Sequence, residues 1–152
     1  MQLETFSRQL QHDGHYQTPS DAMRRLPVKA GSWAAFSFYA GGLGSVVLRG
    51  LTALVRGTFD HRTLGQLSFL LLRKAEKLGT QVTFSGFEVL KDHKGPLVFV
   101  ANHMSLIETI LLPCGLMPFG PLSIVARRSL SRYPGFGRVL LATKPILVTR
   151  NN

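Results

Sequence analysis

One stretch of the chain repeats apolar residues at the spacing of a helix. Leucine and alanine side chains recur there at intervals of three and four residues, which places them on one face of an α-helix. Lysine and arginine crowd its end, where cations suit the helix dipole, and Gly79 is a natural C-terminal stop. The pattern predicts an amphipathic helix over residues 62–78, buried against a partner helix or lipid. Its apolar stripe consists of Leu64, Leu67, Leu71, Ala75 and Leu78.

After residue 80 the hydrophobic pattern changes to short runs. Residues 81–84 alternate between polar and apolar side chains, as a half-buried strand does. Residues 104–112 have a helical pattern, which we expect Pro113 to end. A continuous apolar run, typical of a strand buried on both faces of a sheet, lies at 97–100, and two further short buried strands are predicted at 122–125 and 146–148. Strands that alternate with helices predict an α/β layer fold for this part of the chain.

A long uncharged stretch precedes the predicted amphipathic helix. It covers 19 residues, Ala30 to Leu48, close to the length with which a helix crosses a bilayer. Positive charge on both of its sides suits a segment that dips into one leaflet as well as one that crosses. A buried core helix is the alternative, but the basic flanks lead us to expect membrane contact. These flanks are Arg24, Arg25, Lys29, Arg49 and Arg56.

Net charge narrows the class of partner. Eighteen Lys and Arg against eight Asp and Glu give the 152 residues a formal net charge of +10. This excess of positive charge implies a polyanionic partner, which could be nucleic acid, an anionic membrane or a phosphate-bearing substrate. The sequence has no finger, recognition-helix or aromatic RNA-binding motif, so we expect no nucleic-acid partner. Cys114 is the single cysteine, so the chain cannot form an internal disulfide. We interpret Cys114 as a small buried apolar residue.

Candidate catalytic residues follow the continuous apolar run at 97–100. His103 stands directly after it, at the edge of the sheet where α/β proteins place reacting groups. A neutral imidazole can take a proton from an alcohol, and a carboxylate such as Glu108 can orient the ring and stabilise its cation. Five positions apart, the two side chains would not share a face of an ideal helix. They can meet if His103 lies in the turn before the helix; otherwise Asn102 and His103 simply cap it.

The surrounding sequence resembles a known family. The stretch GFEVLKDHKGPLVFVANHMSLIE resembles the first conserved block of the lysophosphatidic acid acyltransferases (1-acyl-glycerol-3-phosphate acyltransferases), in which Asn-His is followed after four residues by Asp. Residues 126–130, 133–137 and 146–150 resemble the second block, with its basic pair, Pro-x-x-Gly turn and strand that ends in Arg. The two blocks stand in the family's order, and the resemblance covers about residues 81–150.

The resemblance implies an O-acyltransferase of phospholipid biosynthesis. It would move a fatty acyl group from acyl-CoA or acyl-carrier protein to a hydroxyl of a lysophosphatidate-like lysophospholipid, at the cytoplasmic face of a membrane. His103 would be the general base, and Glu108 would orient it. Arg150 would help to hold the acceptor's phosphate, which a planar guanidinium suits. Arg127 and Arg128 would share that task or form a basic face near anionic lipid.

The resemblance implies no cofactor besides the acyl donor. No metal is expected either, because the histidines lack the spacing of ligands. Two departures from the family stand out. Glu108 replaces the family's Asp with a side chain one methylene longer, and the family's third block, a Glu-Gly-Thr-Arg phosphate-binding loop, is not found before Asn152. We therefore expect a fragment, which would be inactive if the remaining block is needed for turnover.

Together these features predict an α/β protein with N-terminal membrane-associated helices, followed by the first half of an α/β glycerolipid acyltransferase domain. Its expected segments are a polar basic one at 1–29, hydrophobic and amphipathic membrane-associated helices at 30–79, and an incomplete acyltransferase domain at 80–152. A catalytically silent basic protein that binds an anionic membrane is the alternative function. It would use the basic residues that flank the long uncharged stretch.

Overall fold

Five α-helices and four short strands make up most of the part of the chain that the structure describes. The structure is a computed structural model, and it describes residues 2–22, 33, 36–104 and 106–149. The helices are α1 (Leu3–Asp13), α3 (Gly44–Val55), α4 (His61–Lys77), α5 (Leu106–Leu116) and α6 (Phe136–Ala142). The strands are β1 (Tyr16–Gln17), β2 (Thr83–Phe84), β3 (Val125–Arg127) and β4 (Ile146–Val148). Short helical turns are η1 (Ser20–Ala22), η3 (Ser37–Leu43), η4 (Phe87–Leu90), η5 (Met117–Phe119) and η6 (Arg128–Arg132).

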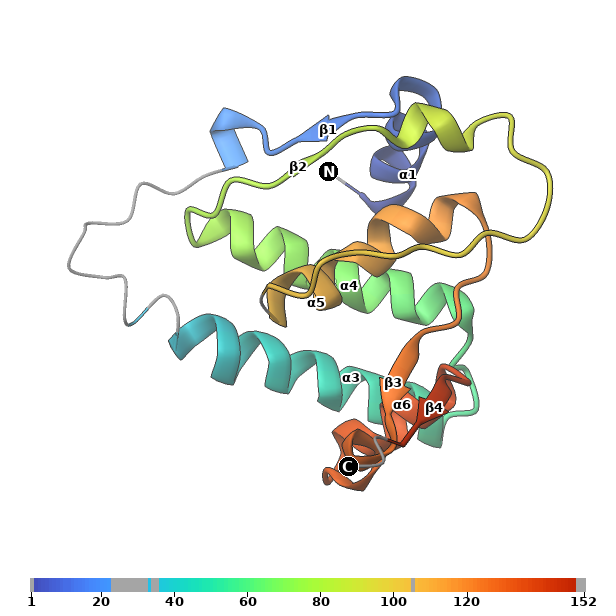
Figure 1. Ribbon diagram of the computed structural model, residues 1–152. Coiled ribbons are helices and arrows are strands. Elements are labelled where there is room, and N and C mark those ends of the chain that lie inside the picture. Colours follow the sequence, from blue (N-terminus) through green and yellow to red (C-terminus); the bar gives the residue numbers. More distant parts are fainter. Residues whose placement is uncertain (1, 23–32, 34–35, 105, 150–152) are drawn as a thin grey trace.

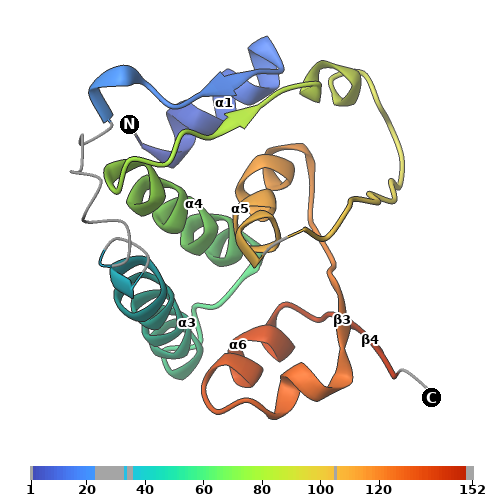
Figure 2. The same ribbon diagram turned by 60° about the vertical axis from the view of Figure 1, so that its left-hand side comes forward.

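The helices α4 and α5 pack together in the middle of the molecule (Figure 1). On one side of them lie α1 and the antiparallel pair β1–β2, in which Tyr16 stands opposite Phe84. On the other side lie α3, α6 and the parallel pair β3–β4, and the view in Figure 2 shows the same order. The strands β3 and β4 are joined through η6 and α6, so they form one βαβ unit.

This architecture corrects the predicted fold class. We expected an α/β layer fold behind N-terminal membrane-associated helices, but the described residues are mainly helical, with two sheets of two strands each. Among these residues, no helix is both long enough and apolar enough to cross a bilayer. The part of the long uncharged stretch that is described is the π-helical η3 and the start of α3, and Arg49 interrupts α3 with a charge. The flanking residues Arg24, Arg25 and Lys29 lie outside the described residues.

The run at residues 97–100 is the element on which the predicted layer fold fails. It is not a strand in the structure, and its side chains are exposed, with Val98 at 89% and Val100 at 92%. Apolar composition shows a preference for burial, but a strand also needs a neighbour to take its backbone hydrogen bonds. The described strands already pair with one another, β1 with β2 and β3 with β4. The last predicted strand, 146–148, is confirmed as β4, whereas the run at 122–125 becomes a strand only from Val125.

The amphipathic helix predicted at 62–78 is confirmed as α4. It starts at a capping box, in which the carboxylate of Asp60 accepts a hydrogen bond from the backbone N–H of Thr63, 2.8 Å away. It ends before Gly79, whose φ of 88° is left-handed and therefore suits glycine. The predicted stripe faces inward: Leu67, Leu71 and Ala75 are buried. The core that it joins takes side chains from segments between α1 and α5, among them Phe6, Leu10, Phe69, Leu72, Phe84 and Cys114.

A buried carboxylate lies on the polar edge of this core. Glu76 of α4 has no exposed surface. Its Oε1 accepts hydrogen bonds from the hydroxyls of Tyr16, at 2.5 Å, and Thr18, at 2.9 Å, and its Oε2 pairs with the guanidinium of Arg73. Thr18 in turn exchanges hydrogen bonds with the backbone of Val82, so the carboxylate joins α4 to both strands of the antiparallel pair.

The helix α5 runs on through Pro113, where we expected it to end. Proline lacks an N–H and disturbs the preceding helical turn, which leaves backbone groups without their usual partners. Ser68 of α4 takes their place: its hydroxyl donates to the carbonyl of Ile110, at 2.6 Å, and accepts from the backbone N–H of Cys114, at 3.0 Å. One side chain thus bridges a carbonyl and an amide that would bond each other in a regular helix. Tertiary contact therefore keeps α5 helical as far as Leu116.

Replacing the buried carboxylate will destabilise the fold. Glu76→Ala leaves the buried Tyr16 hydroxyl without its acceptor and removes the partner of Arg73. We expect the free energy of unfolding to fall by about 3 kcal/mol. Urea denaturation followed by circular dichroism measures this change. The matched control is Glu4→Ala, an exposed glutamate in α1, which should change the free energy by less than about 0.5 kcal/mol. Equal effects of the two changes would contradict the role given to Glu76.

Stability will also fall at high pH because of Tyr16. Burial raises the pKa of its hydroxyl above the ordinary value, and the hydrogen bond to Glu76 and the charge of that carboxylate raise it further. The pKa is thus higher in the folded chain than in the unfolded chain, so the stabilisation is complete below about pH 10 and is lost as the pH rises beyond it. We expect the free energy of unfolding to fall by up to about 1.4 kcal/mol per pH unit there. Tyr16→Phe should flatten this decline, and Tyr133→Phe, at an exposed tyrosine, should leave it unchanged.

Candidate active site

The structure brings His103 and Glu108 together. His103 lies in irregular chain three positions before α5 begins at Leu106, and Glu108 belongs to the first turn of that helix. The His103 Nδ1 atom is 3.1 Å from Glu108 Oε1. Two residues five positions apart would lie on different faces of a helix. His103 precedes the regular helix, so its side chain can still reach Glu108. The histidine side chain is 71% exposed and the glutamate side chain 34% exposed, so the pair opens to solvent.

Thr109 is a third member of this site that the sequence did not lead us to expect. Its Oγ1 lies 3.2 Å from the same Nδ1 atom of His103. A hydroxyl can donate or accept, so it fits the ring in either of its protonation states. Its position directly after Glu108 could have identified it in the sequence, because a residue in the first turn of a helix can contact the segment that precedes the helix.

The partners of Nδ1 assign the protonation of the neutral ring. An ionised carboxylate only accepts hydrogen bonds, so Nδ1 carries the hydrogen and donates it to Glu108. The other ring nitrogen, Nε2, then has a lone pair. Both hydrogen bonds that the ring makes to described residues involve Nδ1. Nε2 is therefore the atom with which His103 can accept a proton from a substrate.

The basic residues predicted to hold phosphate lie elsewhere in the chain. Arg127 ends β3 and Arg128 begins η6, and both are exposed. Within the described residues, neither forms a hydrogen bond or an ion pair with His103 or Glu108. Arg150 lies outside the described residues. The phosphate-binding role of these three arginines stays a prediction.

Neither a cysteine nucleophile nor a metal centre emerges from the described residues. Cys114 is fully buried, and its Sγ lies 3.0 Å from the carbonyl of Leu111. Burial raises the pKa of the Cys114 thiol to about 12, which disfavours the reactive thiolate. In the same part of the chain, no three histidine, cysteine or acidic side chains gather closely enough to hold a metal ion.

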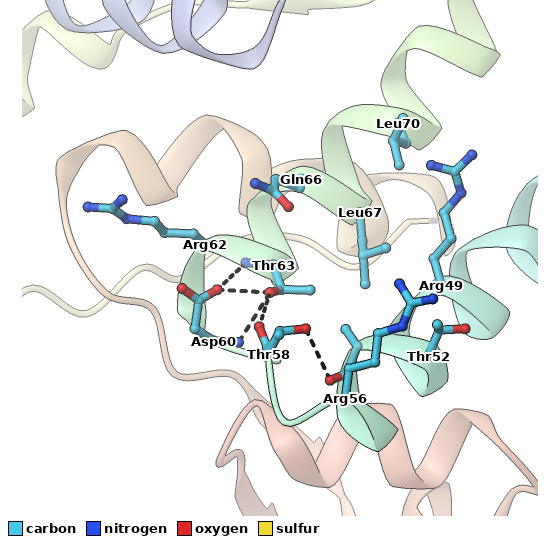
Figure 3. A pocket seen from close by; sticks show the side chains of 11 residues that line it. Arg49, Thr52, Arg56, Thr58, Asp60, Arg62, Thr63, Gln66, Leu67 and Leu70 are labelled. Atoms are coloured by element: carbon cyan, nitrogen blue, oxygen red, sulfur yellow. Dashed lines mark hydrogen bonds between the residues drawn. The ribbon is translucent and has the colours of Figure 1, made fainter.

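A second group of polar side chains lies between α3 and α4, around a hollow of about 490 Å³ (Figure 3). Three arginines line it, namely Arg49, Arg56 and Arg62, together with a single acid, Asp60. The pKa of Asp60 is lowered, mainly by its hydrogen bonds with Thr63. Sequence reasoning gave Arg49 and Arg56 a role only in the alternative function, as flanks of the uncharged stretch that would bind an anionic membrane, and did not group them as a site. Their spacing of seven residues was the missed signal, because it places both on one face of a helix.

Comparison with known proteins leaves the family open. The chain matches no family model, no curated protein and no solved structure. We therefore infer the function of the chain from the geometry of its two sites.

The tautomer of His103 tests the geometry of this site directly. We expect the neutral ring to carry its hydrogen on Nδ1, because Glu108 accepts it there, whereas the ring of a free histidine side chain prefers the hydrogen on Nε2. The ¹⁵N chemical shifts of the ring, measured at a pH where it is neutral, distinguish the two forms. Glu108→Gln should shift the population toward hydrogen on Nε2, since the amide no longer requires a donor. A ring with its hydrogen on Nε2 in the unchanged protein would contradict the proposed pair.

Proposed function

We propose that the chain carries the general base of an O-acyltransferase. The substrates are a fatty acyl thioester, either acyl-CoA or acyl-carrier protein, and a lysophosphatidate-like lysophospholipid. The observation that carries the proposal is the hydrogen bond between His103 Nδ1 and Glu108 Oε1. It leaves Nε2 with a lone pair at an exposed position, where a lipid hydroxyl can approach. The resemblance of residues 81–150 to the lysophosphatidic acid acyltransferases supports the choice of substrates.

The reaction needs one proton relay through the histidine. Nε2 of His103 takes the proton of the acceptor hydroxyl as its oxygen attacks the carbonyl carbon of the thioester. The imidazolium that forms is stabilised by the carboxylate of Glu108, to which Nδ1 donates. The tetrahedral intermediate then collapses, the carbon–sulfur bond breaks, and the proton on Nε2 passes to the departing thiolate. The products are an ester and a free thiol, and His103 returns to its neutral state.

Binding of the acceptor's phosphate falls to Arg150, Arg127 and Arg128 in this proposal. Arg127 and Arg128 are exposed and so accessible to a ligand, and a guanidinium offers a planar pair of donors to a phosphate. The place of action is the cytoplasmic face of a membrane, because a lysophospholipid and its acylated product both stay in the bilayer. The net charge of +10 favours an anionic surface of this kind.

Release of thiol from the acyl thioester tests the proposal. The purified chain is mixed with acyl-CoA and lysophosphatidate, free thiol is measured by a colour reaction, and the lipid product by mass spectrometry. We expect His103→Ala to lower the rate about 100- to 10,000-fold, the usual contribution of a general base. Glu108→Gln should lower it as well, whereas Glu108→Asp keeps a carboxylate and should retain activity.

The matched control is His93→Ala, at an exposed histidine in the turn that follows η4. It should leave the rate of thiol release unchanged. Activity that survives His103→Ala would refute the role of this residue. If the unchanged chain released no thiol but still bound anionic vesicles, with or without His103, the silent membrane-binding function would be favoured instead.

A further inference from the structure

The hollow between α3 and α4 is lined by three exposed arginines and one acid, Asp60. Arg49 lies in α3 and Arg56 is the residue that caps its C-terminal end, two turns and about 10.5 Å further along the helix axis, and Arg62 belongs to the first turn of α4. None of the three guanidinium groups forms an ion pair with a described carboxylate. Exposed arginines that line a hollow and form no ion pair are suited to an anionic ligand.

The acid in this hollow acts on Arg62 and not on the pair Arg49–Arg56: the pKa of Asp60 is lowered mainly by its hydrogen bonds with Thr63 and further by the charges of His61 and Arg62. The Oδ1 atom of Asp60 is held by the backbone N–H and the hydroxyl of Thr63, each at 2.8 Å, where it caps α4. In Figure 3 Arg49 and Arg56 lie together on the α3 side of the hollow, and Arg62 extends from α4 on the far side of Asp60. The pair on α3 is therefore the part of the hollow where the positive charges act together.

We propose that this hollow binds the phosphate group of an anionic ligand through Arg49 and Arg56. Two guanidinium groups on one face offer several donors in planar pairs, which match the oxygens of a phosphate better than two ammonium groups would. The site shares no residue with the pair His103–Glu108. The inference therefore does not depend on acyl transfer.

The edge of α3 beside the two arginines favours a phosphate that belongs to a lipid, because Leu48 and Val55 precede Arg49 and Arg56 by one position, about 100° around the helix. Leu48 and Val55 are 66% and 89% exposed. Leu48 also lines a second hollow, of about 550 Å³, with Leu43, Val47 and Leu51, against the loop at Pro134. The second hollow lies on the other face of α3, so the exposed side chains of Leu48 and Val55 are the apolar surface beside the basic hollow. A lipid with an anionic head would find partners for both of its ends, whereas a free phosphate compound would use the basic hollow alone.

Binding experiments with three probes test the site and identify the source of the phosphate. The probes are inorganic phosphate, followed by NMR at constant ionic strength, and two kinds of phosphatidylcholine vesicle, followed by flotation. One kind contains phosphatidate and the other contains oleate at the same surface charge. We expect tighter binding to the phosphatidate vesicles than to the oleate vesicles. Saturable shifts at Arg49 and Arg56 with inorganic phosphate, without that vesicle preference, would identify free phosphate as the source.

Two double variants and one control separate a built site from diffuse charge. Arg49→Gln with Arg56→Gln should weaken binding at least about tenfold, since hydrogen bonds to a charged group are lost. Arg49→Lys with Arg56→Lys keeps the charge but loses the planar donor pairs, and it should weaken binding as well. The control, Arg8→Gln with Lys94→Gln, removes the same charge at two exposed positions in α1 and in the loop after η4.

The control should bind within about threefold of the unchanged protein, because diffuse charge alone contributes little at physiological salt. The proposal is overturned if the control loses as much affinity as the glutamine variant, or if the lysine variant binds like the unchanged protein. Failure to bind any of the three probes would overturn it as well. Thermal unfolding by circular dichroism confirms that each variant is folded. His103→Ala should leave binding of all probes unchanged, which separates this site from the proposed reaction.

Discussion

The carboxylate of Glu76 is the interaction on which the arrangement of the chain depends. A charge can lie inside apolar packing only when its oxygens are hydrogen-bonded and its charge is paired. Tyr16 and Thr18 supply the hydrogen bonds to Oε1, and Arg73 supplies the opposite charge. Two of these three partners come from the segment after α1. The buried carboxylate of α4 therefore has all of its partners only when that segment is packed against the helix. Because Thr18 also bonds the backbone of Val82, the same network fixes where β2 begins.

The helix α4 has a similar role toward the candidate active site. Ser68 inserts its hydroxyl between a carbonyl and an amide of α5, next to Pro113. This contact anchors α5, and Glu108 and Thr109 stand in the first turn of that helix. His103 is then held by hydrogen bonds to those two side chains. Both buried polar groups of α4 thus act on other segments of the chain, one on the antiparallel strands and one on the helix that carries the candidate site.

The two proposals use different parts of the fold for different chemistry. A proton relay needs one histidine with a defined tautomer, which a turn before a helix can provide. A phosphate needs several fixed positive donors, which two turns of a helix provide in α3. The proposed acyl transfer does not depend on the proposed phosphate site, but both proposals involve a phosphate-bearing lipid as the ligand. The excess of lysine and arginine over acids suits such a ligand, since it draws anionic surfaces toward the protein before any specific contact forms.

The sequence by itself determined the elements whose signal is local. The apolar stripe of α4 depends on neighbours three and four positions away, and the helix lies where the stripe and the stop at Gly79 predict it. The sequence also singled out His103 and Glu108, although their roles are proposals. Tertiary structure decided what depends on distant partners. Whether residues 97–100 pair as a strand depends on a neighbouring strand, and the described strands pair elsewhere. Whether α5 continues past Pro113 depends on Ser68, 45 positions earlier. An apolar run indicates that a segment prefers to be buried. Which strand or side chain it then bonds to is decided only when distant segments come together in the fold.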